Sequence, residues 1–135
     1  MVGLSKEEEE VRDTVSSIYK ALEDLNAEEL DSHFSRSKDL LAYGQRWDSK
    51  HKKFGQIAEE HKRELQALKS LRITSKELEV HVRGSVAWVA DRSHQVAETK
   101  DGQKIEGDLR TTLVLQKPKP NDPWLIIQFH ASRGT

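Results

Sequence analysis

Residues 85–117 read SVAWVADRSHQVAETKDGQKIEGDLRTTLVLQK and contain the clearest local structural signal of the chain. Near their centre, Asp101-Gly102 stands between two runs that alternate apolar and polar side chains. Both residues tolerate a positive φ angle, as the two-residue turn of a β-hairpin requires. The pattern therefore predicts antiparallel strands at Ser85–Thr99 and Ile105–Lys117, joined by a two-residue turn.

Strand patterns also lie on both sides of this hairpin. Residues 78–82 alternate apolar and polar side chains before the Arg83-Gly84 turn. After the proline-rich loop 118–123, residues 124–132 return to a strand-like pattern. An alternation with period two is typical of a β-strand. The C-terminal half is therefore predicted to form an antiparallel meander of about four strands.

The N-terminal half has the longer period of helices. A Ser-x-x-Glu capping box at residues 5–8 opens a first helix, and an Asn-x-x-Glu signal at residues 26–29 opens a short second one. Asp39–Tyr43 is interpreted as a short extended piece that stops at Gly44. A third helix is expected from about Asp48 to Leu71. Helices followed by a meander predict a single α+β domain over residues 1–135.

The composition limits the class of protein. With 135 residues, 35% hydrophobic and 33% charged, the chain is long enough for one core, and it has no cysteine for disulfides or thiolate sites. No run approaches the ~20 apolar residues of a membrane helix. Acidic residues 7–10 stand where a signal peptide would be basic and then apolar. We therefore expect a cytoplasmic protein, and no nucleotide-loop, serine-elbow or metal-ligand spacing predicts a cofactor or a metal.

The net charge of −1 is unevenly distributed. Basic residues concentrate around Arg46–Lys53, where Trp47 and Phe54 are interspersed. Such a stretch can bind nucleic acid, but it can equally be the solvated face of a helix. A dedicated nucleic-acid binder is usually basic over the whole domain, and this chain is not. The helix-face interpretation is therefore favoured.

Turn positions predict which side chains share a face of the sheet. A two-residue turn at 101–102 pairs Asp91 with Thr112, and a loop centred on Pro120 pairs Thr112 with Gln128 and Arg110 with His130. One face then has an apolar end and a polar end, the latter made of Asp91, Arg110, Thr112, Gln128 and His130. An apolar surface that ends in convergent polar groups is typical of a small-molecule pocket. A satisfied polar network at an interface would have the same pattern, so both interpretations stay open.

The opposite face of the predicted sheet is also apolar. It carries Trp88, Leu109, Leu113, Leu115 and Phe129. An antiparallel sheet packed on helices normally leaves one side polar and wet. Because the helices can cover only one side, we expect a homodimer through the sheet.

The chain resembles the SnoaL-like, ketosteroid-isomerase-like group of the nuclear transport factor 2 superfamily over roughly residues 6–132. The resemblance depends on the order and spacing of several strings, namely IYKAL at 18–22, FS at 34–35, DLLAYG at 39–44, Trp47, LRIT at 71–74, VAWV at 86–89, RTTLVLQK at 110–117 and WLIIQFHAS at 124–132. It implies a cone-shaped α+β fold with a pocket in its mouth, commonly dimeric. Members include isomerases, dehydratases, epoxide hydrolases and cyclases, and also association modules without chemistry, so the fold does not define the function.

The isomerase residues of that group are only partly present. Tyr19 stands where those enzymes place their oxyanion-hole tyrosine. Their proton-shuttling acid corresponds to Leu41 or Ala42 here, and their second acid to about Thr112. Steroid isomerisation by that mechanism is therefore not expected.

Two functions remain for the sequence. In the first, a small hydrophobic, carboxylate or carbonyl ligand binds in a pocket, with His130 as base or hydrogen-bond acceptor, Arg110 as clamp and Asp91 orienting Arg110. Tyr19 and Tyr43 would donate hydrogen bonds, Trp47 would form an apolar wall, and Thr112 and Gln128 would complete the lining. In the second, the chain is an association module and the polar cluster is a buried network.

Overall fold

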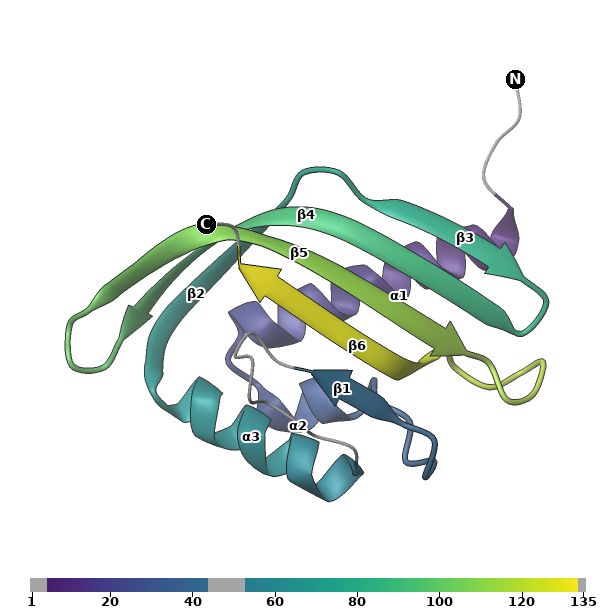
Figure 1. Ribbon diagram of the computed structural model, residues 1–135, viewed down its shortest axis with the longest axis horizontal. Helices are drawn as coiled ribbons and strands as arrows, with labels where there is room; N and C mark the ends of the chain where they lie inside the picture. The colour runs from purple at the N-terminus through teal and green to yellow at the C-terminus, as the bar shows by residue number, and fades with distance from the viewer. Residues whose placement is uncertain (1–4, 44–52, 134–135) are drawn as a thin grey trace.

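The helices lie on one side of a strongly curved, open sheet (Figure 1). The computed structural model describes residues 5–43 and 53–133. In chain order its elements are α1 (Lys6–Glu23), α2 (Ala27–Asp31), β1 (Leu41–Tyr43), α3 (Phe54–Gln66), β2 (Leu68–Ser75), β3 (Glu79–Arg83), β4 (Val86–Thr99), β5 (Lys104–Gln116) and β6 (Leu125–Arg133). The α+β architecture is as predicted. Among these elements no helix is long and apolar enough to cross a membrane.

The sheet has six strands in the order β1-β6-β5-β4-β2, and β3 also pairs with β4. The first half of β4 pairs with β3 and the second half with β2. All pairs are antiparallel except β1 with β6, which is parallel. The sheet therefore contains the predicted meander and two additional strands, of which β1 corresponds to the extended piece predicted at Asp39–Tyr43.

The starts of α1 and α2 were predictable because each has its own side-chain cap. Ser5 Oγ accepts a hydrogen bond of 3.1 Å from the Glu8 amide, and Asn26 Oδ1 accepts one of 3.0 Å from the Glu29 amide. These side chains satisfy amides that a helix leaves without partners in its first turn. α1 then buries Val11, Val15 and Ile18, which recur at helical spacing.

The third helix is shorter at its C-terminal end than predicted. It ends at Gln66, and residues 68–75 form β2 instead of a last helical turn. Leu65 and Leu68 have helical spacing, but Leu71 pairs with Ala97 of β4. The long strand β4 offers backbone hydrogen bonds that a local pattern cannot reveal. The predicted start near Asp48 lies outside the described residues.

The β4–β5 turn differs from the predicted one by a single residue. Thr99 and Gln103 face each other, because the Thr99 amide donates to the Gln103 carbonyl at 2.8 Å, so the loop has three residues, 100–102. Only Gly102 has a positive φ, +92°, whereas a two-residue type I′ turn also needs one at Asp101. The predicted pairing of Asp91 with Thr112 is therefore wrong: Asp91 pairs with Thr111. One residue of shift moves a side chain to the other face of the sheet.

A second irregularity lies between β5 and β6. Leu115 pairs with Ile126 and Val114 with Gln128, so Ile127 is an extra residue in β6. Such a bulge shifts every later pair along the strand. A loop centred on Pro120 would pair Gln116 with Trp124, but Gln116 pairs with Leu125, and the bulge adds a second residue of shift. Thr112 therefore pairs with His130 instead of Gln128, and Arg110 with Ser132 instead of His130, contrary to the prediction.

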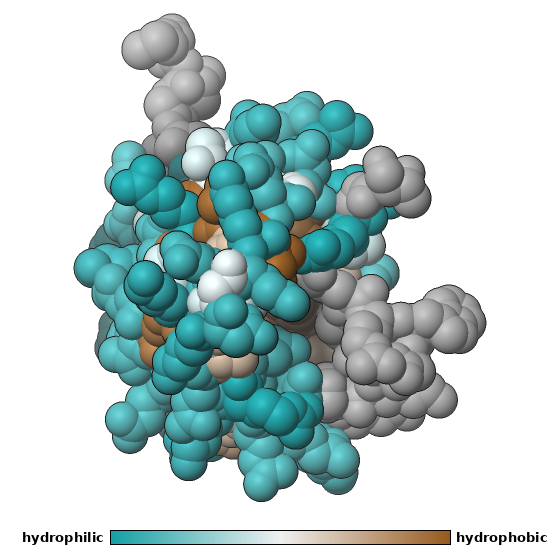
Figure 2. Space-filling view, turned by 90° about the vertical axis from the view of Figure 1, so that its left-hand side faces the viewer, coloured by the Kyte–Doolittle hydropathy of each residue, from teal (hydrophilic) through white to brown (hydrophobic). Residues whose placement is uncertain are grey.

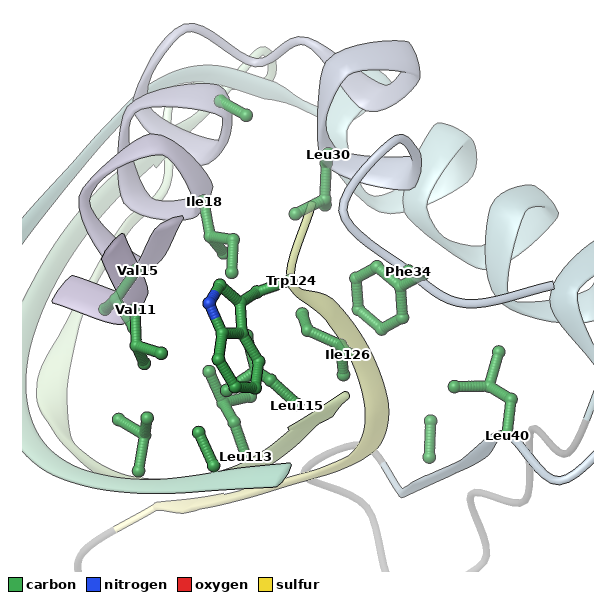
Figure 3. Close-up of a cluster of buried hydrophobic side chains, with 14 of the residues drawn as sticks. Val11, Val15, Ile18, Leu30, Phe34, Leu40, Leu113, Leu115, Trp124 and Ile126 are labelled. Atoms are coloured by element: carbon green, nitrogen blue, oxygen red, sulfur yellow. The ribbon is translucent and has the colours of Figure 1, made fainter. Parts of the chain in front are cut away.

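The core lies between the helices and the inner face of the sheet (Figure 3). Trp124 is 3% exposed and stands between the α1 stripe and the sheet residues Leu113 and Leu115. Its indole N–H donates to Glu10 Oε2 at 3.2 Å, so its one polar atom has a partner. Leu30, Phe34 and Ile126 close the cluster on the side of α2 (Figure 3).

Candidate ligand site

The inner face of the sheet changes from apolar to polar along β4. Ala87 and Val89 face the helices and are buried at 0% and 3% exposure. Asp91 and Ser93 follow on the same face and are buried at 4% and 3%. Within the part of the chain that the structure describes, these two are the only buried polar residues. A mostly apolar interior with a few polar groups is typical of a small-molecule site.

Asp91 is held from two directions. The hydroxyl of Tyr19, from α1, donates a hydrogen bond of 2.6 Å to its Oδ2. The amide of Glu77, in the connection between β2 and β3, donates one of 3.2 Å to its Oδ1. Burial of a carboxylate is costly unless such donors compensate it. The carboxylate therefore links α1 to the sheet at the point where the inner face becomes polar.

Tyr19 is a neutral hydroxyl in this setting. Burial, followed by the hydrogen bond to Asp91, raises the pKa of Tyr19 well above its ordinary range, because a phenolate beside a carboxylate would be strongly disfavoured. The proton of the hydroxyl is directed to Asp91. Its oxygen keeps lone pairs that can accept a hydrogen bond from a ligand.

The predicted cluster of Asp91 with Arg110, Thr112, Gln128 and His130 is not formed. Asp91 faces the helices, and the other four side chains are exposed on the outer face of the sheet. The shift at the 100–102 loop is the cause, since it separates Asp91 from the face of Thr112. Asp91 and Arg110 therefore cannot form the predicted pair through the sheet.

The remaining predicted residues divide in the same way. Tyr19 lies at the inner site, beside Asp91. Tyr43 is on the outer face, 42% exposed, with its ring centroid 6.2 Å from that of His130. Trp47, and the basic stretch from Arg46 as far as residue 52, lie outside the described residues. The predicted residues that are described thus form two separate groups: Tyr19 with Asp91 on the inner face, and Tyr43 and Thr112 beside His130 on the outer face.

The outer face exposes hydrophobic side chains at two places, Leu41 and Tyr43 on the edge strand β1 and Val86 and Trp88 on β4, with β6 and β5 between them. These four are the large hydrophobic residues that are exposed among those described, at 37–43%. Ala42 and Ala87, their neighbours in sequence, face inward and are buried. His81 stacks on Trp88 with ring centroids 5.6 Å apart. The prediction that Trp88 shares one apolar face with Leu109, Leu113 and Leu115 is wrong. Trp88 is exposed on the outer face, whereas the three leucines are buried on the inner face, because Leu113 pairs with Val89.

Sequence reasoning missed one polar cluster on the outer face. His94 Nδ1 lies 2.8 Å from Asp108 Oδ1, and its Nε2 lies 2.8 Å from Glu106 Oε2. The hydrogen bonds to Asp108 and Glu106 raise the pKa of His94 above its ordinary value. Correct register would have found this cluster, because His94 pairs directly with Asp108. Among the described residues, no group of three or more His, Asp or Glu side chains is arranged to hold a metal ion.

Comparison with known proteins shows the family. Residues 11–134 match the SnoaL-like domain. The chain belongs to the SnoaL-like domain family. None of the curated proteins compared with this SnoaL-like domain matches it.

Solved structures of the nuclear transport factor 2-like (NTF2-like) superfamily have the same fold. A proposed dehydratase of the NTF2-like family from Streptomyces avermitilis superposes with a TM-score of 0.84 at 18% identity, over 96% of both chains. An NTF2-like superfamily protein from Salmonella enterica serovar Typhimurium gives 0.84 at 19% identity, over 95% of this chain and 91% of that one. A ketosteroid isomerase-like protein from Erwinia carotovora atroseptica gives 0.80 at 13% identity, over 98% and 99%. At identities of 13–19%, these similarities show a shared fold and nothing further.

Proposed function

We propose that this SnoaL-like domain binds a small, largely apolar molecule carrying a hydroxyl group, between the helices and the polar part of the inner sheet face. The hydrogen bond between Tyr19 and the buried Asp91 carries this proposal. A ligand hydroxyl would donate to the Tyr19 oxygen while Tyr19 donates to Asp91, giving a short chain of hydrogen bonds. Such a chain is favourable where water is excluded.

The residues around this pair agree with an apolar ligand. Ser93 follows Asp91 on the inner face, and Leu109 lies opposite Ser93 on β5. Leu71, Ala97 and Ala131 are buried too, yet they and Leu109 lie outside the main core cluster. An apolar wall beside two polar groups would orient a ligand by its hydroxyl. A proposed dehydratase and a ketosteroid isomerase-like protein have the same fold.

A thermal-shift screen with apolar alcohols and ketones would identify a ligand of the wild-type protein. Binding to the folded state raises the melting temperature. Tyr19→Phe removes only the hydroxyl and should weaken binding of the hit alcohol by about tenfold, the effect of one lost hydrogen bond in a buried site. Tyr43→Phe is the matched control, because it removes the same group on the outer face. Equal affinity of wild type and Tyr19→Phe would refute the inner site.

We also propose a homodimer through the outer face of the sheet, where Leu41, Tyr43, Val86 and Trp88 are exposed. Large hydrophobic side chains exposed on one face of a sheet are typical of a protein interface. Trp88→Lys should give a monomer in sedimentation velocity, since the charge could not be buried in a symmetric contact. Gln66→Lys, on the exposed end of α3, should leave the association state unchanged. A wild-type monomer at all concentrations would refute the dimer.

A further inference from the structure

Gly107 leaves a gap in the inner face of the sheet. On β5 it lies between Glu106 and Asp108, which both contact His94 on the outer face, so position 107 faces inward. Across the strands it pairs with Gln95 of β4, and the pairing is regular on both sides of this point. Gly107 is therefore the one inner-face position of β5 that presents no side chain.

Neither the backbone nor crowding requires a glycine at this position. The φ angle of Gly107 lies outside the left-handed region, and an added Cβ would meet no atom within 4 Å. A glycine inside a strand weakens it, because glycine loses more backbone entropy on folding and packs no side chain. Where strain and crowding do not explain it, such a glycine is typical of a place where a ligand approaches the backbone closely.

The inner face is less covered at this gap than on either side of it. Gly107 and Gln95 are half-buried, whereas Ser93 and Ala97, the next inward-facing residues of β4, are buried. Leu109, the next inward-facing residue of β5, is buried too. Seen from the end with the β4–β5 hairpin, hydrophobic residues are visible between hydrophilic ones (Figure 2). The gap therefore opens in a face that is otherwise covered.

The side chains around the gap are mainly apolar. Ile105 and Leu109 flank Gly107 on the inner face of β5, and Ile73 of β2 pairs with Gln95. Both isoleucines are half-buried, so they still expose apolar surface. An alkyl chain would remove this surface from water, which favours binding.

Open volume also reaches the inner face between the gap and the polar pair of Tyr19 and Asp91. Ser93, the inward-facing neighbour of Asp91 on β4, and Leu109 line a depression of about 650 Å³. Its other lining residues are all charged. Volumes of this size are those of small-molecule sites.

We propose that Gly107 selects the length of the ligand in the inner site, and that this ligand is an elongated apolar alcohol. The inference rests on the function proposed above, in which the ligand hydroxyl binds at Tyr19 and Asp91. Asp91 and Gln95 are four residues apart on β4, about 13 Å at the rise of a strand. An alcohol of that length places its far end over Gly107, where a larger side chain would exclude it.

Isothermal titration calorimetry with 1-hexanol and 1-decanol tests the proposal on the full chain. Each buried methylene group strengthens binding about fourfold, so the wild type should bind 1-decanol more tightly than 1-hexanol by a factor on the order of a hundred. Gly107→Leu should bind 1-hexanol as the wild type does and lose most of the additional affinity for 1-decanol. Gly107→Ala should lose a smaller part of it.

Gly55→Leu is the matched control. Gly55 is exposed near the start of α3, and an added Cβ meets nothing within 4 Å there either. Both alcohols should bind this variant as they bind the wild type. An equal loss of 1-decanol affinity in Gly55→Leu and Gly107→Leu would overturn the proposal.

The outcomes separate this inference from the function on which it rests. If the wild type binds neither alcohol, the inner site fails, and the role of Gly107 fails with it. If the wild type binds both alcohols and Gly107→Leu binds 1-decanol equally tightly, the length selection is wrong and the inner site stands. A clear drop in the melting temperature of Gly107→Ala would also overturn the proposal, because the glycine would then serve a bend of the strand.

Discussion

The hydroxyl oxygen of Tyr19 lies 2.6 Å from Oδ2 of Asp91, across 72 residues of sequence. The contact joins the first helix to the longest strand, at a point where Asp91 and Ser93 are the buried polar residues among those described. It is both the candidate ligand contact and a structural link. These two roles can be separated because stability and ligand affinity are measured independently.

Tyr19→Phe is expected to destabilise the domain by about 1–3 kcal/mol, because it leaves Oδ2 of a buried carboxylate without its donor. Urea unfolding measures the loss. Tyr43→Phe, on the exposed outer face, should change the free energy of unfolding by less than about 0.5 kcal/mol. If both variants lose the same amount, the Tyr19 hydroxyl has no special partner in solution.

His94 should make the stability depend on pH near neutrality. The hydrogen bonds to Asp108 and Glu106 raise the pKa of His94 above 6.5, so its stabilising contribution is complete below that value and is lost as the pH rises through the raised pKa. His94 in turn lowers the pKa values of Glu106 and Asp108 below 4.5 and 3.8. Their contribution is present above those values and is lost as the pH falls.

The His94→Gln variant tests this window. Between pH 4.5 and 6.5 the wild type should melt above the variant, and the difference should shrink as the pH rises past neutrality. The effect is small, because the cluster is largely exposed and screened. His130→Gln serves as control, since no carboxylate contact is found for His130 among the described residues. A wild-type advantage that grows with pH would contradict the assigned charges.

The hairpin shows how far the sequence predicts this fold. Asp101-Gly102 located the turn, and alternation located β4 and β5 to within one or two residues. Two-residue and three-residue loops both suit this dipeptide, and the choice decides which face every side chain takes. The fold could be predicted with either loop, because both faces of the sheet carry apolar residues. The candidate site could not, because a shift of one residue changes the face on which Asp91 lies.

Long-range contacts account for what else was missed. The start of β2, as far as Leu71, was predicted as helix because its partners on β4, such as Ala97 for Leu71, lie more than twenty residues away in sequence. Asp91 was interpreted as the partner of an arginine, and the correct partner, Tyr19, comes from a helix at the other end of the chain. Only the resemblance to a family singled out Tyr19.

The loop conformation itself can be tested at Gly102. With φ at +92°, Gly102→Ala should cost about 1–2 kcal/mol, because a Cβ is strained in the left-handed region. Gly107→Ala on β5 is the matched control, since its φ is not in that region and an added Cβ meets nothing within 4 Å. It should be neutral or slightly stabilising in urea unfolding. Equal effects at both glycines would contradict the three-residue loop.

The core is tested by two leucines at opposite extremes of burial. Leu115 on β5 is 0% exposed and lies in the cluster around Trp124, and Leu41 on β1 is 41% exposed. Leu115→Ala leaves a cavity that the rigid sheet cannot close, so it should cost about 2–5 kcal/mol in urea unfolding. In the Trp88→Lys background, which removes the proposed dimer contact, Leu41→Ala removes the same atoms from an exposed position and should cost far less. An equal loss at both positions would mean that Leu41 is as well covered in solution as Leu115, contrary to their exposures.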